Sequence, residues 1–168
     1  DNVGTTLALG AARARATPGS RLVVAGSAAE DGADSPYARA KRAQALAAAS
    51  LIHDGLDVRV GVLYNLCGPG TPESLAPGAW AAQTARLERR GGGTLLHGDL
   101  APVRDYLDVR DAAEALSLLG LTPGLSGRFE VCSGRGTRMS EVLRHIRAAA
   151  RSPISTRRDP ALARAVDT

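Results

Sequence analysis

The run Arg-Leu-Val-Val-Ala-Gly-Ser, residues 21–27, is a short apolar segment bounded by turn residues. Such runs are typical of buried strands in parallel sheets. Ser27 is then expected at the carboxyl end of a strand, which is the edge where open α/β sheets bind ligands. The segment therefore predicts an α/β protein with a hydroxyl at its ligand-binding edge, and a simple turn serine is the alternative interpretation.

The segment Ser-Pro-Tyr-Ala-Arg-Ala-Lys, residues 35–41, predicts the start of a helix, because proline is favoured in the first helical turn. Tyr37 and Lys41 are four residues apart, so their side chains project from the same face of that helix. An ammonium group beside a phenol favours the phenolate. Such a pair suits proton transfer next to a hydride transfer at a carbonyl or alcohol, and Ser27 can orient the reacting oxygen. We therefore predict that Ser27, Tyr37 and Lys41 are catalytic.

This order of serine and Tyr-x-x-x-Lys resembles the short-chain dehydrogenase/reductase superfamily. Four further segments resemble motifs of its extended branch, the NAD(P)-dependent nucleotide-sugar epimerases, dehydratases and reductases. They are Asn-Val-Gly-Thr (2–5), Tyr-Asn-Leu-Cys-Gly-Pro-Gly (64–70), Arg-Asp-Tyr-Leu-Asp-Val-Arg-Asp (104–111) and Glu-Val-Cys-Ser-Gly (130–134). Because these motifs occur in the family's order and cover nearly the whole chain, a chance resemblance is excluded.

The resemblance implies the second half of a Rossmann-like parallel sheet with a small α/β substrate-binding subdomain. It divides a single domain, residues 1–168, into two parts. Residues 1 to about 66 are the sheet part with the Ser27, Tyr37 and Lys41 site, and residues from about 67 to 168 are the substrate-binding part, interleaved with the last strands of the sheet. The family's fingerprint Gly-x-x-Gly-x-x-Gly is not found in the sequence. We therefore expect a C-terminal part without the first dinucleotide-binding strands. A non-catalytic fragment that binds no cofactor by itself is the alternative.

The resemblance also assigns individual roles. Lys41 would hold the nicotinamide ribose of NAD(P), and Tyr37 would contact the cofactor and act as general acid and base. Asn65 and Arg104 correspond to residues that contact the nucleotide sugar, although a turn asparagine and a surface arginine paired with Asp105 are the alternative interpretations. The family further implies a homodimer formed through the Tyr37 helix and the helix before it.

The residues after Ser27 discriminate between reactions. Sugar 4,6-dehydratases of this family carry a glutamate two positions after the serine or threonine, and this position is Ala29 here. Glu30, one position later, resembles the pattern of the GDP-4-keto-6-deoxymannose reductases, as do the segments 70–78 and 98–105. The sequence therefore favours reduction of a GDP-linked 4-keto-6-deoxy sugar, with a 4-epimerase or dehydratase as the alternative.

The composition is that of a globular protein, with 44% hydrophobic and 23% charged residues. A net charge of +4, scattered along the chain, gives no basic stripe for nucleic acid. No apolar stretch approaches the roughly 20 residues that span a bilayer. The cysteines and histidines lack metal-ligand spacing, so we expect reduced thiols, no metal site and a cytoplasmic location.

Overall fold

The computed structural model describes residues 2–16, 19–32 and 34–162. The chain folds into two compact units. Unit 1 extends to Tyr64 and resumes with Arg110–Cys132, and unit 2 consists of Asn65–Val109 and the described residues from Ser133 onward. Each unit has its own hydrophobic core.

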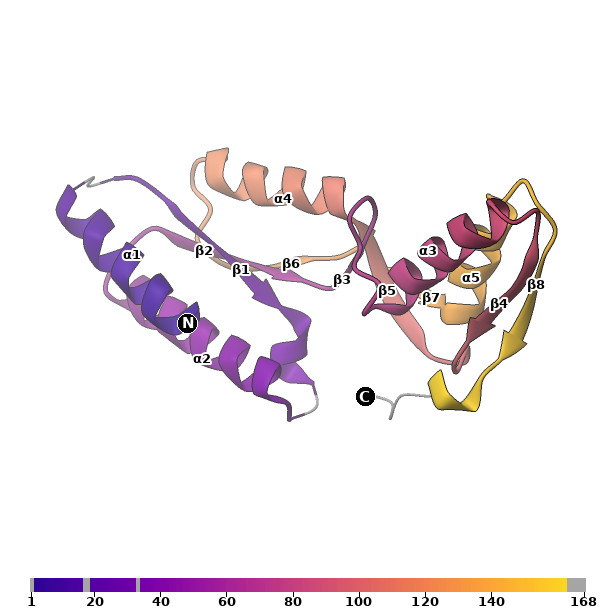
Figure 1. The fold of residues 1–168 in the computed structure, drawn as a ribbon. Helices are drawn as coiled ribbons and strands as arrows, with labels where there is room; N and C mark the ends of the chain where they lie inside the picture. Colours follow the sequence, from indigo (N-terminus) through magenta and orange to yellow (C-terminus); the bar gives the residue numbers. More distant parts are fainter. Residues whose placement is uncertain (1, 17–18, 33, 163–168) are drawn as a thin grey trace. The chain divides into compact units, whose positions relative to one another are not determined.

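Unit 1 contains a parallel sheet in the order β1-β2-β6, formed by β1 (Leu22–Ser27), β2 (Val58–Leu63) and β6 (Gly127–Val131). Helices α1 (Asn2–Ala16) and α2 (Pro36–His53) lie on one face, and α4 (Val109–Leu121) lies on the other (Figure 1). Helices on both faces of a parallel sheet define an α/β fold. The predicted fold class is confirmed.

The alternation of side chains along β2 explains these layers. Val58, Val60 and Val62 are buried in the core on the α2 side. Gly61 faces α4, where a Cβ atom would lie 2.6 Å from Cδ2 of Leu116. The glycine therefore allows the helix to pack closely against the sheet.

The short loop between β1 and α2 begins with a helical turn. Residues 28–31 form one 3₁₀ turn, η1 (Ala28–Asp31), directly after Ser27. Helix α2 then begins at Pro36, as expected, and the Ser35 hydroxyl caps it by accepting a hydrogen bond from the amide of Ala38 at 3.1 Å.

Unit 2 contains two small sheets and two helices. One sheet has the order β3-β5-β7, from β3 (Asn65–Cys67), β5 (Val103–Asp108) and β7 (Gly136–Arg138), and the other pairs β4 (Gly93–His97) with β8 (Ile154–Arg158). Helices α3 (Ala76–Glu88) and α5 (Met139–Ala148) supply most of its core, with Trp80, Met139 and Leu143 buried beside Leu95. The three-residue strands β3 and β7 were not expected from the sequence. A short 3₁₀ turn, η2 (Pro160–Leu162), ends the described chain.

Candidate active site

Ser27 is the last residue of β1, at the carboxyl end of the parallel sheet. Its side chain caps the η1 turn, because Oγ accepts a hydrogen bond from the amide of Ala29 at 3.3 Å. This bond uses a lone pair of the hydroxyl oxygen and not its hydrogen. Ser27 thus has a fixed oxygen and a hydrogen that can be donated to a ligand.

Tyr37 and Lys41 lie in the first two turns of α2. The Lys41 ammonium group donates a hydrogen bond of 2.8 Å to the carbonyl of Ala25, two residues before Ser27 in β1. The structure therefore brings Lys41 to the strand that carries Ser27. Tyr37 is 55% exposed, which leaves its phenol accessible to a ligand.

Glu30 occupies the centre of the η1 turn and is almost completely buried, with 3% of its surface exposed. Its carboxylate forms an ion pair with Arg128 of β6, and Arg128 also pairs with Asp31 at 2.9 Å. Burial raises the pKa of Glu30, and Arg128 offsets this effect only in part. From α2, Arg42 donates hydrogen bonds to the carbonyls of Glu30 and Gly32. The η1 turn after Ser27 is therefore held in place by side chains from two elements, β6 and α2.

Unit 2 contains a cavity of about 320 Å³ that is lined by both predicted substrate-binding residues, Asn65 and Arg104. Trp80 and Tyr106 add aromatic surface to its wall. The Asn65 amide donates a hydrogen bond of 3.1 Å to the carbonyl of Asp105, which leaves its own oxygen as an acceptor toward the cavity. Aromatic faces, an amide and a guanidinium group together suit a nucleotide with its phosphates.

Asp105 organises the backbone beside this cavity. Its carboxylate accepts hydrogen bonds from the amide and hydroxyl of Ser133, both at 2.9 Å, and from the amide of Arg135 at 3.1 Å. Burial opposes the ionisation of Asp105, but these hydrogen bonds outweigh it and lower the pKa of the carboxyl group. Asp105 is thus a structural anion that ties β5 to the turn before β7.

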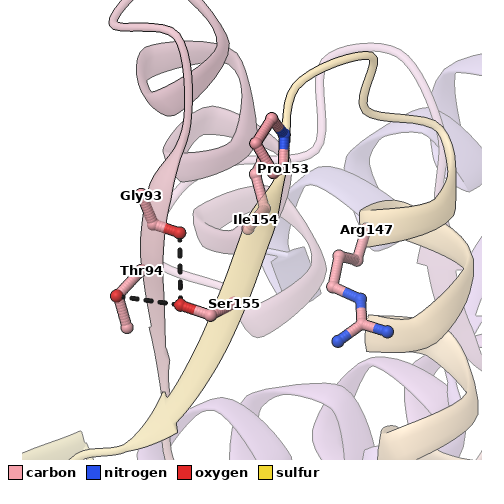
Figure 2. A pocket seen from close by; sticks show the side chains of 6 residues that line it. All are labelled: Gly93, Thr94, Arg147, Pro153, Ile154 and Ser155. Atoms are coloured by element: carbon pink, nitrogen blue, oxygen red, sulfur yellow. Dashed lines mark hydrogen bonds between the residues drawn. The ribbon is translucent and has the colours of Figure 1, made fainter.

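A second groove in unit 2 lies between β4, β8 and α5 (Figure 2). Its hydroxyl groups bond to each other, because Oγ1 of Thr94 and Oγ of Ser155 are 2.9 Å apart. Arg147 is the one charged side chain among the residues that line it. None of the predicted site residues lines this groove.

Two further sequence expectations concern metals and membranes. The described residues contain no group of three His, Cys, Asp or Glu side chains that could hold a metal ion. Within the same ranges, no helix has the length and apolarity that crossing a bilayer requires. Cys67 and Cys132 are half-buried and unpaired, and burial raises the pKa of the Cys67 thiol.

The sequence interpretation named Glu30 but missed its partner Arg128, and it also missed Gln44, which bonds to Lys41. The ion pair joins positions 98 residues apart, so no local pattern reveals it. The composition nevertheless contains one signal that points to Lys41, the residue that Gln44 supports. The sequence contains 20 arginines but a single lysine, Lys41, so this position stands out before any motif is considered.

Comparison with known proteins places these features in context. A family model described as the NAD dependent epimerase/dehydratase family matches residues 1–131. GDP-6-deoxy-D-mannose reductase from Pseudomonas aeruginosa is 34% identical over 133 residues, which are 75% of this chain and 42% of that protein. The matched part is therefore less than half of this relative.

Two solved structures show the same fold. One is a protein from Burkholderia cenocepacia, provisionally described as an epimerase, with a TM-score of 0.81, 27% identity and coverage of 99% of this chain and 58% of that one. The other is UDP-glucose 4-epimerase from Thermus thermophilus in complex with NAD, with a TM-score of 0.70 and 27% identity. That match covers 93% of this chain and 56% of the epimerase.

Proposed function

Because this chain belongs to the NAD dependent epimerase/dehydratase family, we propose that it carries the catalytic residues of a nucleotide-sugar oxidoreductase. The reaction proposed is reduction of the keto group of a GDP-linked 4-keto-6-deoxy sugar. The relative named GDP-6-deoxy-D-mannose reductase supports this choice of substrate class. Ser27, Tyr37 and Lys41 are the catalytic residues in this proposal.

The single lysine is the observation that carries the proposal. Of the 21 lysine and arginine residues, the other 20 are arginines, including Arg39 and Arg42 on the same helix. An ammonium group is a compact point charge on a flexible stem, whereas a guanidinium group is a wide planar fork. A chain that uses arginine at 20 positions and lysine at one has a specific requirement for the ammonium group at that position.

The residues around Lys41 fit a nicotinamide cofactor. Within the described part of the chain, two of the three ammonium hydrogens have partners, the carbonyl of Ala25 and the side chain of Gln44. The third is left for a ribose hydroxyl. When bound, NAD(P)H supplies the hydride. Tyr37 then donates its phenolic proton to the carbonyl oxygen, and the Ser27 hydroxyl donates a hydrogen bond to the same oxygen.

We assign substrate binding to unit 2 and the catalytic residues to unit 1. The cavity lined by Asn65 and Arg104 offers hydrogen bonds and a guanidinium group for the nucleotide phosphates. Its wall also contains two acidic residues, Asp99 and Glu73, and Glu73 is neutralised by an ion pair with Arg86 at 3.0 Å. The proposed boundary between the sheet part and the substrate-binding part, near residue 66, is close to the start of unit 2 at Asn65.

The environment of Glu30 supports reduction over dehydration. Elimination of water needs a side chain that moves a proton at the position of Ala29, and a methyl group cannot do so. Glu30 cannot take its place, because its side chain is buried and paired with Arg128. Neither residue can therefore serve in water elimination as the glutamate of the 4,6-dehydratases does.

We further propose that the chain self-associates through α1 and α2. Three leucines on these helices are exposed in the single chain, Leu7 at 42%, Leu9 at 52% and Leu46 at 73%. Leu7 and Leu9 are two residues apart in α1 and lie on different faces of that helix. A second copy packed against α1 and α2 would cover exposed leucines of both helices. Light scattering should then show a dimer that Leu46→Glu converts to a monomer, whereas a monomeric parent chain would contradict the proposal.

The reaction is tested with a chimaera, because the chain spans only part of its relatives. The preceding part of the Pseudomonas aeruginosa reductase is joined to Asn2, and oxidation of NADPH by a GDP-linked 4-keto-6-deoxy sugar is followed by its absorbance. We expect turnover by the chimaera, and no saturable change of NADPH fluorescence with the chain alone. Tyr37→Phe and Lys41→Met should each lower kcat by about 10²–10⁴-fold, the usual contribution of a positioned acid.

Arg39→Met is the matched control, since Arg39 lies on the same helix and pairs with the exposed Asp34. It should keep the kcat of the chimaera. Unchanged kcat in both Tyr37→Phe and Lys41→Met would refute the catalytic assignment. Interconversion of UDP-glucose and UDP-galactose without reduction of the keto sugar would favour the epimerase alternative instead.

A further inference from the structure

A chain of hydrogen bonds connects Lys41 to the buried side of helix α1. The Lys41 ammonium group donates to Oε1 of Gln44 at 3.0 Å, and Nε2 of Gln44 donates to Oγ1 of Thr6 at 3.2 Å. The Thr6 hydroxyl in turn donates to the carbonyl of Asn2 at 2.8 Å. Thr6 is one of the few buried polar residues, with 4% of its surface exposed.

The donors and acceptors in this series of hydrogen bonds are fixed by the bond from Thr6 to Asn2. The single hydrogen of the Thr6 hydroxyl is donated to Asn2, so the hydroxyl oxygen can only accept from Gln44. This requirement turns the NH₂ group of Gln44 toward Thr6 and its oxygen toward Lys41. The oxygen of Gln44 is therefore presented to a cation, which is the stronger kind of hydrogen bond.

A lysine side chain has four rotatable bonds and loses considerable entropy when it is held in one conformation. The hydrogen bond to the carbonyl of Ala25 fixes one hydrogen of the ammonium group. With this contact alone, the ammonium group could still rotate about that hydrogen bond. Gln44 supplies a second contact from one turn further along α2. Two acceptors in different directions define where the third hydrogen points.

We propose that Gln44 and Thr6 are positioning residues, which hold the Lys41 ammonium group so that its third hydrogen is presented to the ligand. The inference rests on the proposed function of Lys41 as the cofactor-binding cation. Neither residue touches the reacting atoms in this proposal, and both act through Lys41. The positioning extends from α1 to α2, across 38 positions of the sequence.

The single lysine makes the test direct. The parent chain and its variants are treated with formaldehyde and cyanoborohydride, and the rate of methylation at Lys41 is measured by peptide mass spectrometry. No cofactor or substrate is present, so the result does not depend on whether the proposed reaction occurs. Gln44→Met removes one hydrogen bond from the ammonium group and should raise the rate about fivefold, the factor that about 1 kcal/mol represents.

Thr6→Val removes the anchor of Gln44 and keeps the size of the side chain. We expect it to raise the rate about twofold, and Thr6→Ser, which restores the hydroxyl, to return the rate to that of the parent. Thr5→Val is the matched control on the exposed side of α1 and should leave the rate unchanged. Circular dichroism establishes that each variant is folded.

A purely structural contact between α1 and α2 would change stability without changing the reactivity of Lys41. Parent-like methylation rates in folded Gln44→Met and Thr6→Val would therefore overturn the proposal. Equal acceleration in Thr5→Val would do the same, because the effect would then come from general loosening of α1. Faster methylation together with full turnover of the Lys41→Met chimaera would leave the positioning intact and refute the catalytic role of Lys41 instead.

Discussion

Replacing Arg59 by methionine tests how the sheet of unit 1 is joined to helix α4. Arg59 is the second residue of the otherwise apolar strand β2 and is 1% exposed. Its guanidinium group donates hydrogen bonds to the carbonyls of Leu119 and Thr122 at the end of α4, and to Asp57 at 3.0 Å. A cation at this end also opposes the negative pole of the helix dipole.

The size of the effect follows from what each partner loses. Leu119 is 7% exposed, so its carbonyl would be left buried without a donor, which costs about 1–3 kcal/mol. Loss of the cation at the helix end adds about 0.3–1 kcal/mol. Asp57 keeps its ion pair with Arg21 at 3.3 Å and is not stranded. We expect Arg59→Met to lower the free energy of unfolding by about 2–4 kcal/mol.

Urea unfolding followed by circular dichroism measures this change, which should shift the midpoint and leave the slope m unaltered. Thermal unfolding should show a melting temperature lower by on the order of 10 °C. Arg21→Met is the matched control, because Arg21 bonds to Gly120 and Leu121 at the same helix end but is about one-third exposed. It should cost less than about 1 kcal/mol. Equal losses in both variants would refute the role assigned to burial.

Three other predictions concern both units. Asp105→Asn should lower the free energy of unfolding, measured in urea at neutral pH, by about 1–3 kcal/mol. Folding lowers the pKa of Asp105, so its contribution to stability is present above pH 3.8 and disappears as the pH falls through the pKa of the folded state. Glu30→Gln should become more stable relative to the parent in urea unfolding as the pH rises above 4.5, because the pKa of Glu30 is raised and its ionisation in the folded state costs stability. An opposite slope would show that the ion pair with Arg128 dominates. Gly61→Ala should cost about 1–3 kcal/mol in thermal unfolding, because the added methyl group would press on Leu116 of α4.

The sequence predicted the elements that local patterns encode. The apolar run before Ser27 and the proline before Tyr37 indicated β1 and α2 correctly, because strand burial and helix initiation depend on neighbouring residues. Strands β3 and β7 were missed, since three residues carry no usable periodicity and their pairing with β5 is set by distant parts of the chain.

Buried polar residues were the other class that the sequence did not reveal. Arg59 interrupts a run of valines, and its charge favours a place at the surface. It is nevertheless buried, because the carbonyl of Leu119 in α4 accepts a hydrogen bond from its guanidinium group. The two residues are 60 positions apart in the sequence. Gln44 and Thr6 are likewise joined across two elements. A hydrogen-bond partner contributed by a distant element leaves no periodic pattern in the local sequence, so these contacts became visible only in the structure.

Only nine residues lie between Ser27 and Tyr37, and the structure shows how the Ser27 hydroxyl, which we propose to be catalytic, is held by this short connection. The Ser27 hydroxyl caps η1, Arg42 binds the carbonyls of that turn, and Arg128 binds the carboxylate of Glu30. Each contact comes from a different element, so the turn is fixed although it has few residues of its own. Because the hydroxyl oxygen accepts from the turn, its hydrogen is directed away from η1. The contact that caps the η1 turn thus leaves the Ser27 hydrogen for the substrate oxygen that we propose as its acceptor.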